Sequence, residues 1–220
     1  ALGVMEYAEM GYLPEAMRNY LLRLGWSHGD NEIISDEKAR EWFNLEHINK
    51  APARFDFAKL ADVNGHYIRA ADDARLVALT LPIIARHLSR ELTEAQHALL
   101  LRAMPSLKER AKTLIGLAES ALFYFEPVPD IADEKAVKQL NDGLELLRNF
   151  IPALEQQSDW THEALFPFAK SWAESQGVKI GALMAPVRVA ITGSTASPSM
   201  FEVMELLGKD ESLARLRAAS

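Results

Sequence analysis

Cysteine is absent from the 220 residues of the sequence, which excludes disulfides, thiolate catalysis and cysteine-bound metal or iron–sulfur sites. Long apolar runs are also missing. The longest, residues 76–85, contains Thr80 and Pro82 and holds about ten residues, whereas a membrane-spanning helix needs about 20. No signal peptide is recognisable at the start. A chain without cysteine fits a reducing compartment, so we expect a cytoplasmic protein with no membrane partner.

Recognisable catalytic chemistry is missing as well. The six histidines never take a metal-ligand spacing, and the eleven glycines are scattered with no phosphate-binding loop among them. His66 is interpreted as a helix-end histidine satisfied by the backbone. Asp72 and Asp73 are adjacent and cannot face each other on a helix, so helix capping explains them better than a carboxylate pair. Glu202 and Glu205 share a face of a terminal helix and are expected to be solvated. We therefore expect no catalytic residue, metal or cofactor in this chain.

Positive charge is also in short supply. The net charge is −7, which argues against indiscriminate nucleic-acid binding, because such binding relies on many lysine and arginine contacts to phosphate. The charge is uneven: residues 1–50 and 129–178 carry −4 and −5, whereas 51–128 and 179–220 each carry +1. The two less acidic segments are where an anionic partner is expected.

Helical periodicity and helix caps run along the whole chain, and no alternating strand pattern accompanies them. The fold is predicted to be all-α. Helices are expected to start at caps along the chain, namely Ser35, Asp56, Asp72, Thr93, Ser106 and Thr161.

Four further details of the helices follow from the pattern. The capping boxes at Thr93 and Ser106 predict helices over 94–104 and 106–122, separated by Pro105. A single long helix is predicted over 134–150. The helix that Thr161 caps should end at Gly177, and the two prolines of 126–130 make that segment the best candidate for a domain boundary.

The segment 178–209 is predicted to form helix, irregular turn and helix. The first helix has an apolar face at three- and four-residue spacing, formed by Ile180, Leu183, Met184, Val187 and Ile191. Pro186 falls inside this helix, where a kink is expected. The helix should stop near Gly193, and Gly208 should close the second helix.

The turn between these two helices is small and polar, with the sequence Gly-Ser-Thr-Ala-Ser-Pro at 193–198. Ser197 is predicted to be the N-cap of the second helix, with Pro198 at its first position. The free N–H groups of a helix N-terminus suit an anionic or acceptor-rich ligand, and Arg188 lies shortly before the turn. From these residues alone, an ordinary corner of an all-α protein, with Arg188 a surface charge, is the favoured interpretation.

Four blocks carry a resemblance to a known family. They are GYLPEAMRNYLLRLGWSHGDNEI at 11–33, ARFDFAKLADVNGHYIRA at 53–70, LKERAKTL at 107–114 and PVRVAITGSTASPSMFEVMELLGKD at 186–210. In order and spacing they resemble the C-terminal half of bacterial glutamyl-tRNA synthetase. Members of that family start with a class I catalytic domain bearing HIGH and KMSKS-like signatures, and both are missing here. The resemblance therefore implies a fragment without the active site, as the start at Ala1 in mid-pattern also suggests.

The family implies an organisation and a partner. Residues 1–72 would form a helical stem-contact domain, and 73–122 and 123–220 two helical anticodon-binding subdomains. The partner would be tRNA(Glu), with tRNA(Gln) left open. The intact enzyme would attach glutamate to tRNA with ATP and Mg²⁺, and the fragment should be inactive alone. We expect a monomer.

The anticodon-reading positions of the family correspond to Arg110, Arg188, Ser197, Pro198 and Met200. Serine and methionine stand where threonine and leucine are common, which keeps a hydroxyl and an apolar surface. An arginine at position 110 is associated in the family with discrimination at the anticodon. An arginine fork matches base acceptors or phosphates, and loop bases are read by edge hydrogen bonds and face packing. The resemblance reverses the interpretation of the 193–198 turn in favour of RNA binding.

Two other classes of function remain open from the sequence. An α-helical protein-interaction scaffold without an RNA role is favoured by the net charge and opposed by the four ordered blocks. A stand-alone α-helical enzyme has no supporting constellation of residues. Binding of a transcribed tRNA(Glu) would separate the RNA-binding hypothesis from both.

Overall fold

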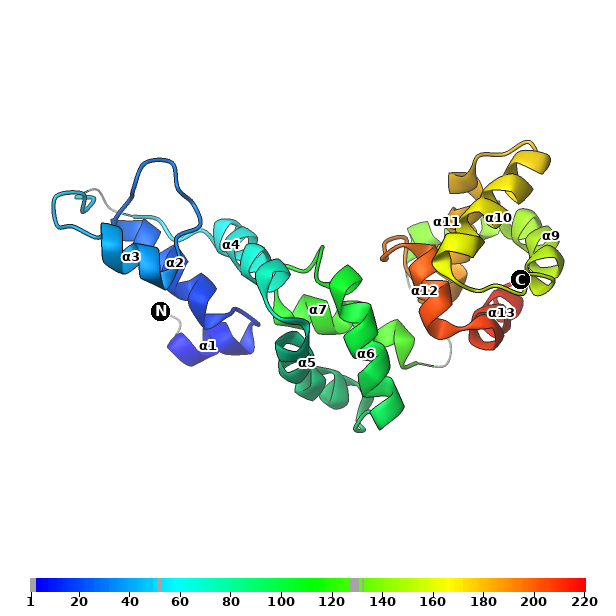
Figure 1. Cartoon of the computed structure of the whole chain (residues 1–220), viewed down its shortest axis with the longest axis horizontal. Coiled ribbons are helices and arrows are strands. Elements are labelled where there is room, and N and C mark those ends of the chain that lie inside the picture. Colours follow the sequence, from blue (N-terminus) through cyan, green and yellow to red (C-terminus); the bar gives the residue numbers. More distant parts are fainter. Residues whose placement is uncertain (1–2, 51–52, 127–130, 132) are drawn as a thin grey trace. The chain divides into compact units, whose positions relative to one another are not determined.

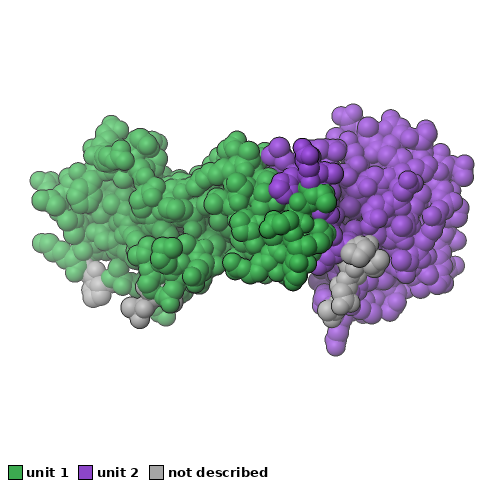
Figure 2. All heavy atoms as spheres, turned by 90° about the horizontal axis from the view of Figure 1, so that it is seen from below, with its two compact units in different colours: residues 1–93, 107–119 green, residues 94–106, 120–220 purple. Residues whose placement is uncertain are grey.

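The computed structural model describes residues 3–50, 53–126, 131 and 133–220. Every regular element in these ranges is a helix, apart from an isolated bridge between Trp26 and Ile48, so the all-α prediction is confirmed (Figure 1). None of the described helices has both the length and the apolar character that a membrane span requires. The chain divides into two compact units (Figure 2), and each is described by itself.

The first unit consists of residues 1–93 and 107–119. Its helices are α1 (Val4–Glu9), α2 (Pro14–Gly25), α3 (Asp36–Trp42), α4 (Phe57–Ala70), α5 (Asp73–Leu88) and most of α7 (Leu114–Ala121).

Three predicted caps of the first unit are confirmed. The Ser35 hydroxyl accepts from the backbone N–H of Lys38, and the Asp72 carboxylate accepts from that of Arg75. The Asp56 carboxylate accepts from two backbone N–H groups at the start of α4. Each side chain satisfies N–H groups that the first turn of a helix leaves without an internal partner, which is why these helices begin where the sequence predicts.

Aromatic packing between α2 and α4 forms the core of the first unit. Tyr12, Tyr20 and Leu60 are buried together, and the Phe55 ring meets the Tyr20 ring edge-on at 4.9 Å between centroids. The Tyr20 hydroxyl also accepts from the backbone N–H of Asp56 at 2.6 Å. The segment that leads into α4 is thereby held against α2.

The second unit consists of residues 94–106 and 120–220. Its elements are most of α6 (Glu94–Leu107), the end of α7 (Leu114–Ala121), the short 3₁₀ helix η1 (Leu122–Tyr124), α8 (Glu134–Asp142), α9 (Leu144–Glu155), α10 (His162–Ser175), α11 (Ile180–Thr192), α12 (Met200–Leu207) and α13 (Lys209–Ala218).

The central helix of this unit is α11, which packs against α8, α9, α10, α12 and α13. Leu183, Met184, Val187 and Ile191 are buried, as the periodicity predicts. Val189 and the alanine after it are buried too, so the helix covers more than one apolar face. A helix that is apolar on most sides belongs in a core, and α11 thereby becomes the rigid support of the turn at its C-terminal end.

Two helix predictions are wrong. The predicted helix 134–150 is two helices that meet at Gly143, where a Cβ atom would lie 2.5 Å from the Pro186 ring of α11. A glycine is needed there because α8 and α11 approach closely. The helix predicted from Ser106 does not start there. Instead, α6 continues through Pro105 to Leu107, and the Ser106 hydroxyl donates back to the Ala103 carbonyl at 3.1 Å, a bond that serine can make inside a helix.

The predicted boundary at 126–130 falls on 127–130, which lie outside the described residues. The predicted domain divisions after residues 72 and 122 stay predictions.

Candidate nucleic-acid interface

The corner between α11 and α12 lies in the second unit. At the end of α11, Gly193 takes a left-handed conformation with φ of 72° and donates to the Val189 carbonyl at 2.8 Å. The predicted stop at Gly193 is therefore confirmed, as is the stop of α12 at Gly208. The predicted start of α12 is wrong: the helix begins at Met200, and Ser199 is its N-cap residue without a side-chain capping bond.

Small polar side chains order the turn from within. The Thr192 hydroxyl donates to the Arg188 carbonyl at 2.8 Å, and the Ser194 backbone N–H donates to the Thr192 hydroxyl at 3.3 Å. The Ala196 backbone N–H donates to the Ser194 hydroxyl at 3.2 Å. These local bonds replace the helical ladder where it stops, so the turn has a defined shape.

The structure brings four of the five predicted site residues together in this corner. The Arg188 Nε–H donates to the Ser197 Oγ at 3.0 Å, and the Ser197 hydroxyl donates to the Pro198 carbonyl at 2.8 Å. The same oxygen lies 3.3 Å from the Met200 sulfur. Arg188 and Pro198 are partly exposed, whereas Ser197 and Met200 are 8% and 2% exposed. The Ser197 hydroxyl therefore contacts Arg188 rather than the backbone N–H groups of α12.

The fifth predicted residue, Arg110, belongs to the first unit. It is exposed in the turn that follows α6.

Sequence reasoning missed Arg215, which fixes the end of α11. Its side chain is 2% exposed, and it donates to the carbonyls of Ile191 at 2.9 Å, Phe123 at 2.7 Å and Glu126 at 2.7 Å. The Glu211 carboxylate one turn earlier accepts from its Nε at 2.6 Å. A basic residue that falls on the apolar face of an amphipathic helix is the signal that could have found it.

Glu205, which was expected to be solvated, is partly exposed and also bonds to the start of α10, which the sequence did not predict. Its carboxylate accepts from both the backbone N–H and the ring Nδ1 of His162, at 2.9 and 2.7 Å. Thr161 takes the N-cap position of α10 without a side-chain bond, so Glu205 performs that role from α12. The two bonds from His162 lower the pKa of the Glu205 carboxyl, and the bond to Glu205 raises the pKa of the His162 ring.

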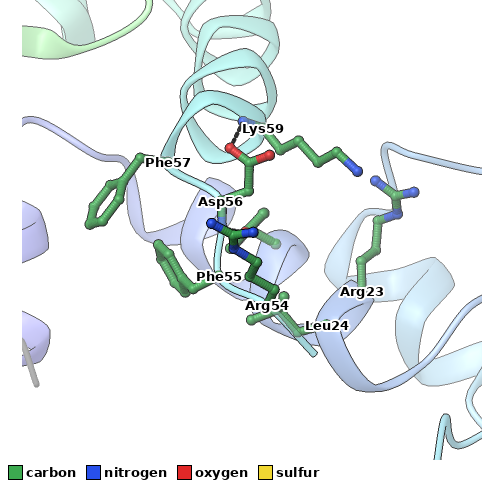
Figure 3. A pocket seen from close by; sticks show the side chains of 8 residues that line it. Arg23, Leu24, Arg54, Phe55, Asp56, Phe57 and Lys59 are labelled. Atoms are coloured by element: carbon green, nitrogen blue, oxygen red, sulfur yellow. Dashed lines mark hydrogen bonds between the residues drawn. The ribbon is translucent and has the colours of Figure 1, made fainter. Parts of the chain in front are cut away.

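A basic pocket of about 650 Å³ lies in the first unit, where the segment before α4 meets α2 (Figure 3). Arg23, Arg54 and Lys59 line it together with aromatic side chains, among them Phe55. Figure 3 shows Arg23 and Lys59 extending toward one another. The Asp56 carboxylate in this pocket accepts from the backbone at the start of α4.

A neighbouring pocket of about 390 Å³ shares Arg23 and Lys59 and adds His66 and Arg69 to the basic lining. Its carboxylates have cationic partners: Glu32 pairs with Arg23 at 3.4 Å, and Asp62 pairs with a lysine, Lys112, at 2.6 Å. Among the described residues, Arg54 and Lys59 pair with no carboxylate. The local surface is therefore positive although the whole chain is acidic. Sequence reasoning missed this cluster, because Arg23 lies on a different segment from Arg54 and Lys59. The less acidic character of 51–128 was a signal for it, but did not single out these residues.

Two family models match the chain. Residues 75–220 match the anticodon binding domain, and residues 2–62 match the catalytic domain of class I tRNA synthetases of the E and Q type.

Individual relatives carry related names. The chain is 52% identical over 217 residues to glutamate–tRNA ligase 2 of Rhodospirillum centenum, covering 98% of this chain and 46% of the relative. It is 49% identical to glutamate–tRNA ligase 2 of Brucella ovis, with shares of 98% and 47%. A crystal structure of a glutamate tRNA ligase from Elizabethkingia meningosepticum, in complex with its amino acid, superposes with a TM-score of 0.81 at 28% identity, covering 97% of this chain and 42% of that one. The chain thus spans about half the length of the relatives that it matches.

Proposed function

The chain belongs to the anticodon binding domain family, in the form that matches the C-terminal half of glutamate–tRNA ligases, and from this premise we propose that it binds tRNA(Glu) by reading the anticodon at the corner between α11 and α12. The resemblance to glutamyl-tRNA synthetase is confirmed. The observation that carries the proposal is the Arg188 guanidinium, which is held at the polar turn inside the matched segment.

The charges at the corner favour a base edge over a phosphate. Arg188 supplies a cation, but Glu202 lies in the first turn of α12. A carboxylate at a helix N-terminus competes with an anionic ligand for the same N–H groups and the same dipole. A neutral base edge, which carries both donors and acceptors, meets less repulsion there. Pro198, partly exposed, offers an apolar surface for the face of an unstacked base.

The basic pocket of the first unit suits the RNA backbone instead. Arg54 and Lys59 are exposed and unpaired with carboxylates among the described residues, and Arg23 lies beside them. Cations of this kind position a nucleic acid through phosphate and add affinity that depends on salt rather than on base identity. We propose that this pocket takes phosphates of the same tRNA, in keeping with a stem-contact role for 1–72 and anticodon-binding roles for 73–122 and 123–220.

The intact protein is proposed to be a class I ligase that joins glutamate to tRNA(Glu) with ATP and Mg²⁺, as a cytoplasmic monomer. Among the described residues there is no group of three or more histidine or acidic side chains that could hold a metal ion, and the sequence has no phosphate-binding loop. We propose that this chain by itself holds neither ATP nor Mg²⁺. We propose that the chain alone is inert in glutamate activation. Glutamate-dependent exchange of pyrophosphate into ATP would contradict this.

Binding of transcribed tRNA(Glu) to the chain and to its Arg188→Ala variant tests the anticodon proposal. We expect the variant to lose about 1–3 kcal/mol of binding free energy, the usual value of a good base contact. Much of the loss should vanish with a tRNA whose contacted base has been substituted. Arg148→Ala is the matched control, since it removes the same charge from an exposed helical site of the same unit. A loss that is equal for every anticodon would leave only electrostatic docking.

The phosphate proposal has its own test. Arg54→Ala and Lys59→Ala should weaken binding by similar factors for all anticodon sequences, and each should reduce the steepness of the salt dependence. Arg110→Ala, tested on tRNA(Glu) and tRNA(Gln), asks whether this residue discriminates between the two. A wild-type chain that binds neither tRNA would overturn the proposed function.

A further inference from the structure

The Ser197 hydroxyl faces Arg188, not the surrounding solvent. The side chain is 8% exposed, and its oxygen accepts from the Arg188 Nε–H at 3.0 Å. Its hydroxyl also lies within hydrogen-bond distance of two acceptors of the same turn, the Pro198 carbonyl at 2.8 Å and the Met200 sulfur at 3.3 Å. By contrast, Ser199, two residues later, is exposed and makes no capping bond.

We infer that Ser197 is a positioning residue whose hydroxyl fixes the orientation of the Arg188 guanidinium, and that it affects RNA binding through Arg188. The inference rests on the proposed anticodon function and specifies how selectivity arises at that site.

The physical reason lies in the shape of the guanidinium. Its donors lie in one plane, so a bond to Nε sets the direction in which the outer nitrogens point. An arginine side chain otherwise loses considerable rotamer freedom when it binds. A residue that restrains it before binding removes part of that cost.

The support behind Ser197 is rigid. Met200 is buried against the same oxygen, and the Thr192 hydroxyl holds the Arg188 carbonyl. Arg215 in turn fixes the carbonyl of Ile191, within the last turn of α11. The hydroxyl that orients Arg188 is therefore itself held in place from both sides of the turn.

A double-mutant cycle separates positioning from direct contact. Its members are the wild-type chain, Ser197→Ala, Arg188→Ala and the double variant, and its probes are transcribed tRNA(Glu) and the same tRNA with one anticodon base substituted. We expect Ser197→Ala to weaken binding of the unaltered tRNA about 5-fold, the usual effect of one hydrogen bond. It should have no further effect when Arg188 is already alanine, because its action then has no target.

Two companion variants sharpen the cycle. Ser197→Thr keeps the hydroxyl and should retain the selectivity between the two tRNAs. Ser199→Ala, which removes an exposed hydroxyl from the same turn, should bind like the wild type. If Ser197→Ala proves too unstable for binding measurements, the Nε–H proton of Arg188 gives a second readout by NMR: it should exchange slowly with solvent in the wild-type chain and in Ser197→Thr, and faster in Ser197→Ala.

The outcomes distinguish this inference from the function on which it rests. Equal losses from Ser197→Ala with and without Arg188 would mean that Ser197 contacts the RNA directly, which overturns the inference and leaves the function standing. The same holds if the Nε–H proton of Arg188 exchanges equally fast in all variants. If the wild-type chain binds neither tRNA, both fail together.

Discussion

In each unit a fully or nearly fully buried polar side chain joins distant backbone segments, Asn64 in the first and Arg215 in the second, and the two side chains differ in charge. In the first unit, the amide of Asn64 accepts from the Leu13 N–H at 2.8 Å and donates to the carbonyls of Gly11 at 3.3 Å and Lys112 at 2.7 Å. In the second unit, the guanidinium of Arg215 performs the equivalent task with three carbonyls and one carboxylate.

The comparison shows how a contiguous stretch of chain, 107–126, is divided between two units. Asn64 binds the carbonyl of Lys112, and Arg215 binds those of Phe123 and Glu126. The amide is neutral and needs no countercharge. The guanidinium offers only donors and carries a charge, so its burial is tolerable only where several acceptors and Glu211 converge on it. Removing the charged side chain should therefore leave more buried groups without a partner.

Arg215→Met should have the largest effect. It preserves much of the apolar volume but leaves three carbonyls without their donor, so we expect the second unit to lose about 3–5 kcal/mol of unfolding free energy. Because the chain has two units, hydrogen exchange read separately in each is the suitable measurement. Exchange should accelerate in 120–220 and not in 1–93.

The control for this variant is Arg217→Met on the same helix. That arginine is 57% exposed and pairs with Glu155, and an exposed pair contributes about 0–1 kcal/mol. Equal effects of the two substitutions would show that the buried contacts of Arg215 have no special weight.

Asn64→Ala should have the next largest effect, confined to the first unit. It leaves the Leu13 N–H and the Lys112 carbonyl without this partner, whereas the Gly11 carbonyl keeps its bond from the Leu114 N–H at 2.9 Å. Two orphaned groups correspond to about 2–4 kcal/mol.

Asn64→Asp sharpens the comparison, because it keeps the shape and the acceptor but turns an oxygen toward two carbonyls. It should be at least as costly as alanine. Asn31→Ala, in an exposed turn, is the control, and a surface change of this kind moves stability by less than about 0.5 kcal/mol. An Asn64→Asp variant as stable as the wild type would contradict the proposed geometry.

The sequence was sufficient for local features and failed for those that depend on distant partners. The caps at Ser35, Asp56 and Asp72 were predictable because each acts on N–H groups two or three residues away. The break at Gly143 was not, since its cause is the Pro186 ring on another helix.

For the candidate site, too, the predictions that depend on local sequence were correct and those that depend on distant partners were not. The glycine stops at 193 and 208 are local, and both were predicted correctly. The prediction that Ser197 caps α12 was wrong because its hydroxyl had two potential partners, the N–H groups of the next helix and the Arg188 side chain nine residues earlier. Only the fold decides between them. The basic pocket was missed for the same reason, as Arg23 and Arg54 meet only after α2 packs on α4.

Gly143→Ala should destabilise the second unit less than Arg215→Met does, and less than Asn64→Ala destabilises the first. This substitution changes only the packing of α8 against α11, because no polar group is removed. The added Cβ would lie 2.5 Å from Cγ of the Pro186 ring, and relief of such an overlap by small shifts costs about 1–3 kcal/mol. Gly181→Ala is the matched control, because that glycine lies in α11 with nothing within 4 Å of the added atom. It should stabilise the unit by about 0.5–1 kcal/mol through helix propensity. Thermal unfolding of both variants measures the difference, and a shift of the same sign in both would contradict the predicted close contact.

The smallest effect on stability is expected from breaking the His162–Glu205 pair. This pair contrasts with Arg215 because its cation, the His162 ring, can lose its charge. The pKa of His162 is raised from 6.5, so its contribution to stability is complete below pH 6.5 and is lost as the pH rises through the higher folded value. The pKa of Glu205 is lowered from 4.5, so its contribution is complete above pH 4.5 and is lost as the pH falls through the lower folded value.

The stability difference between the wild type and Glu205→Gln should therefore be largest between about pH 4.5 and 6.5. It should shrink toward pH 8 without vanishing, because Glu205 stays ionised there and still accepts from the His162 backbone N–H. The charged groups that act on this pair are Glu163 and Glu202 on the histidine and Arg102 on Glu205. Melting temperatures across this range measure the difference.

Arg215→Met should destabilise the unit equally at pH 5.5 and pH 8, because an arginine keeps its charge throughout. If the Glu205→Gln difference were also constant across the range, the bond to the ring would contribute nothing, and only the capping bond to the backbone would stabilise the contact between α10 and α12.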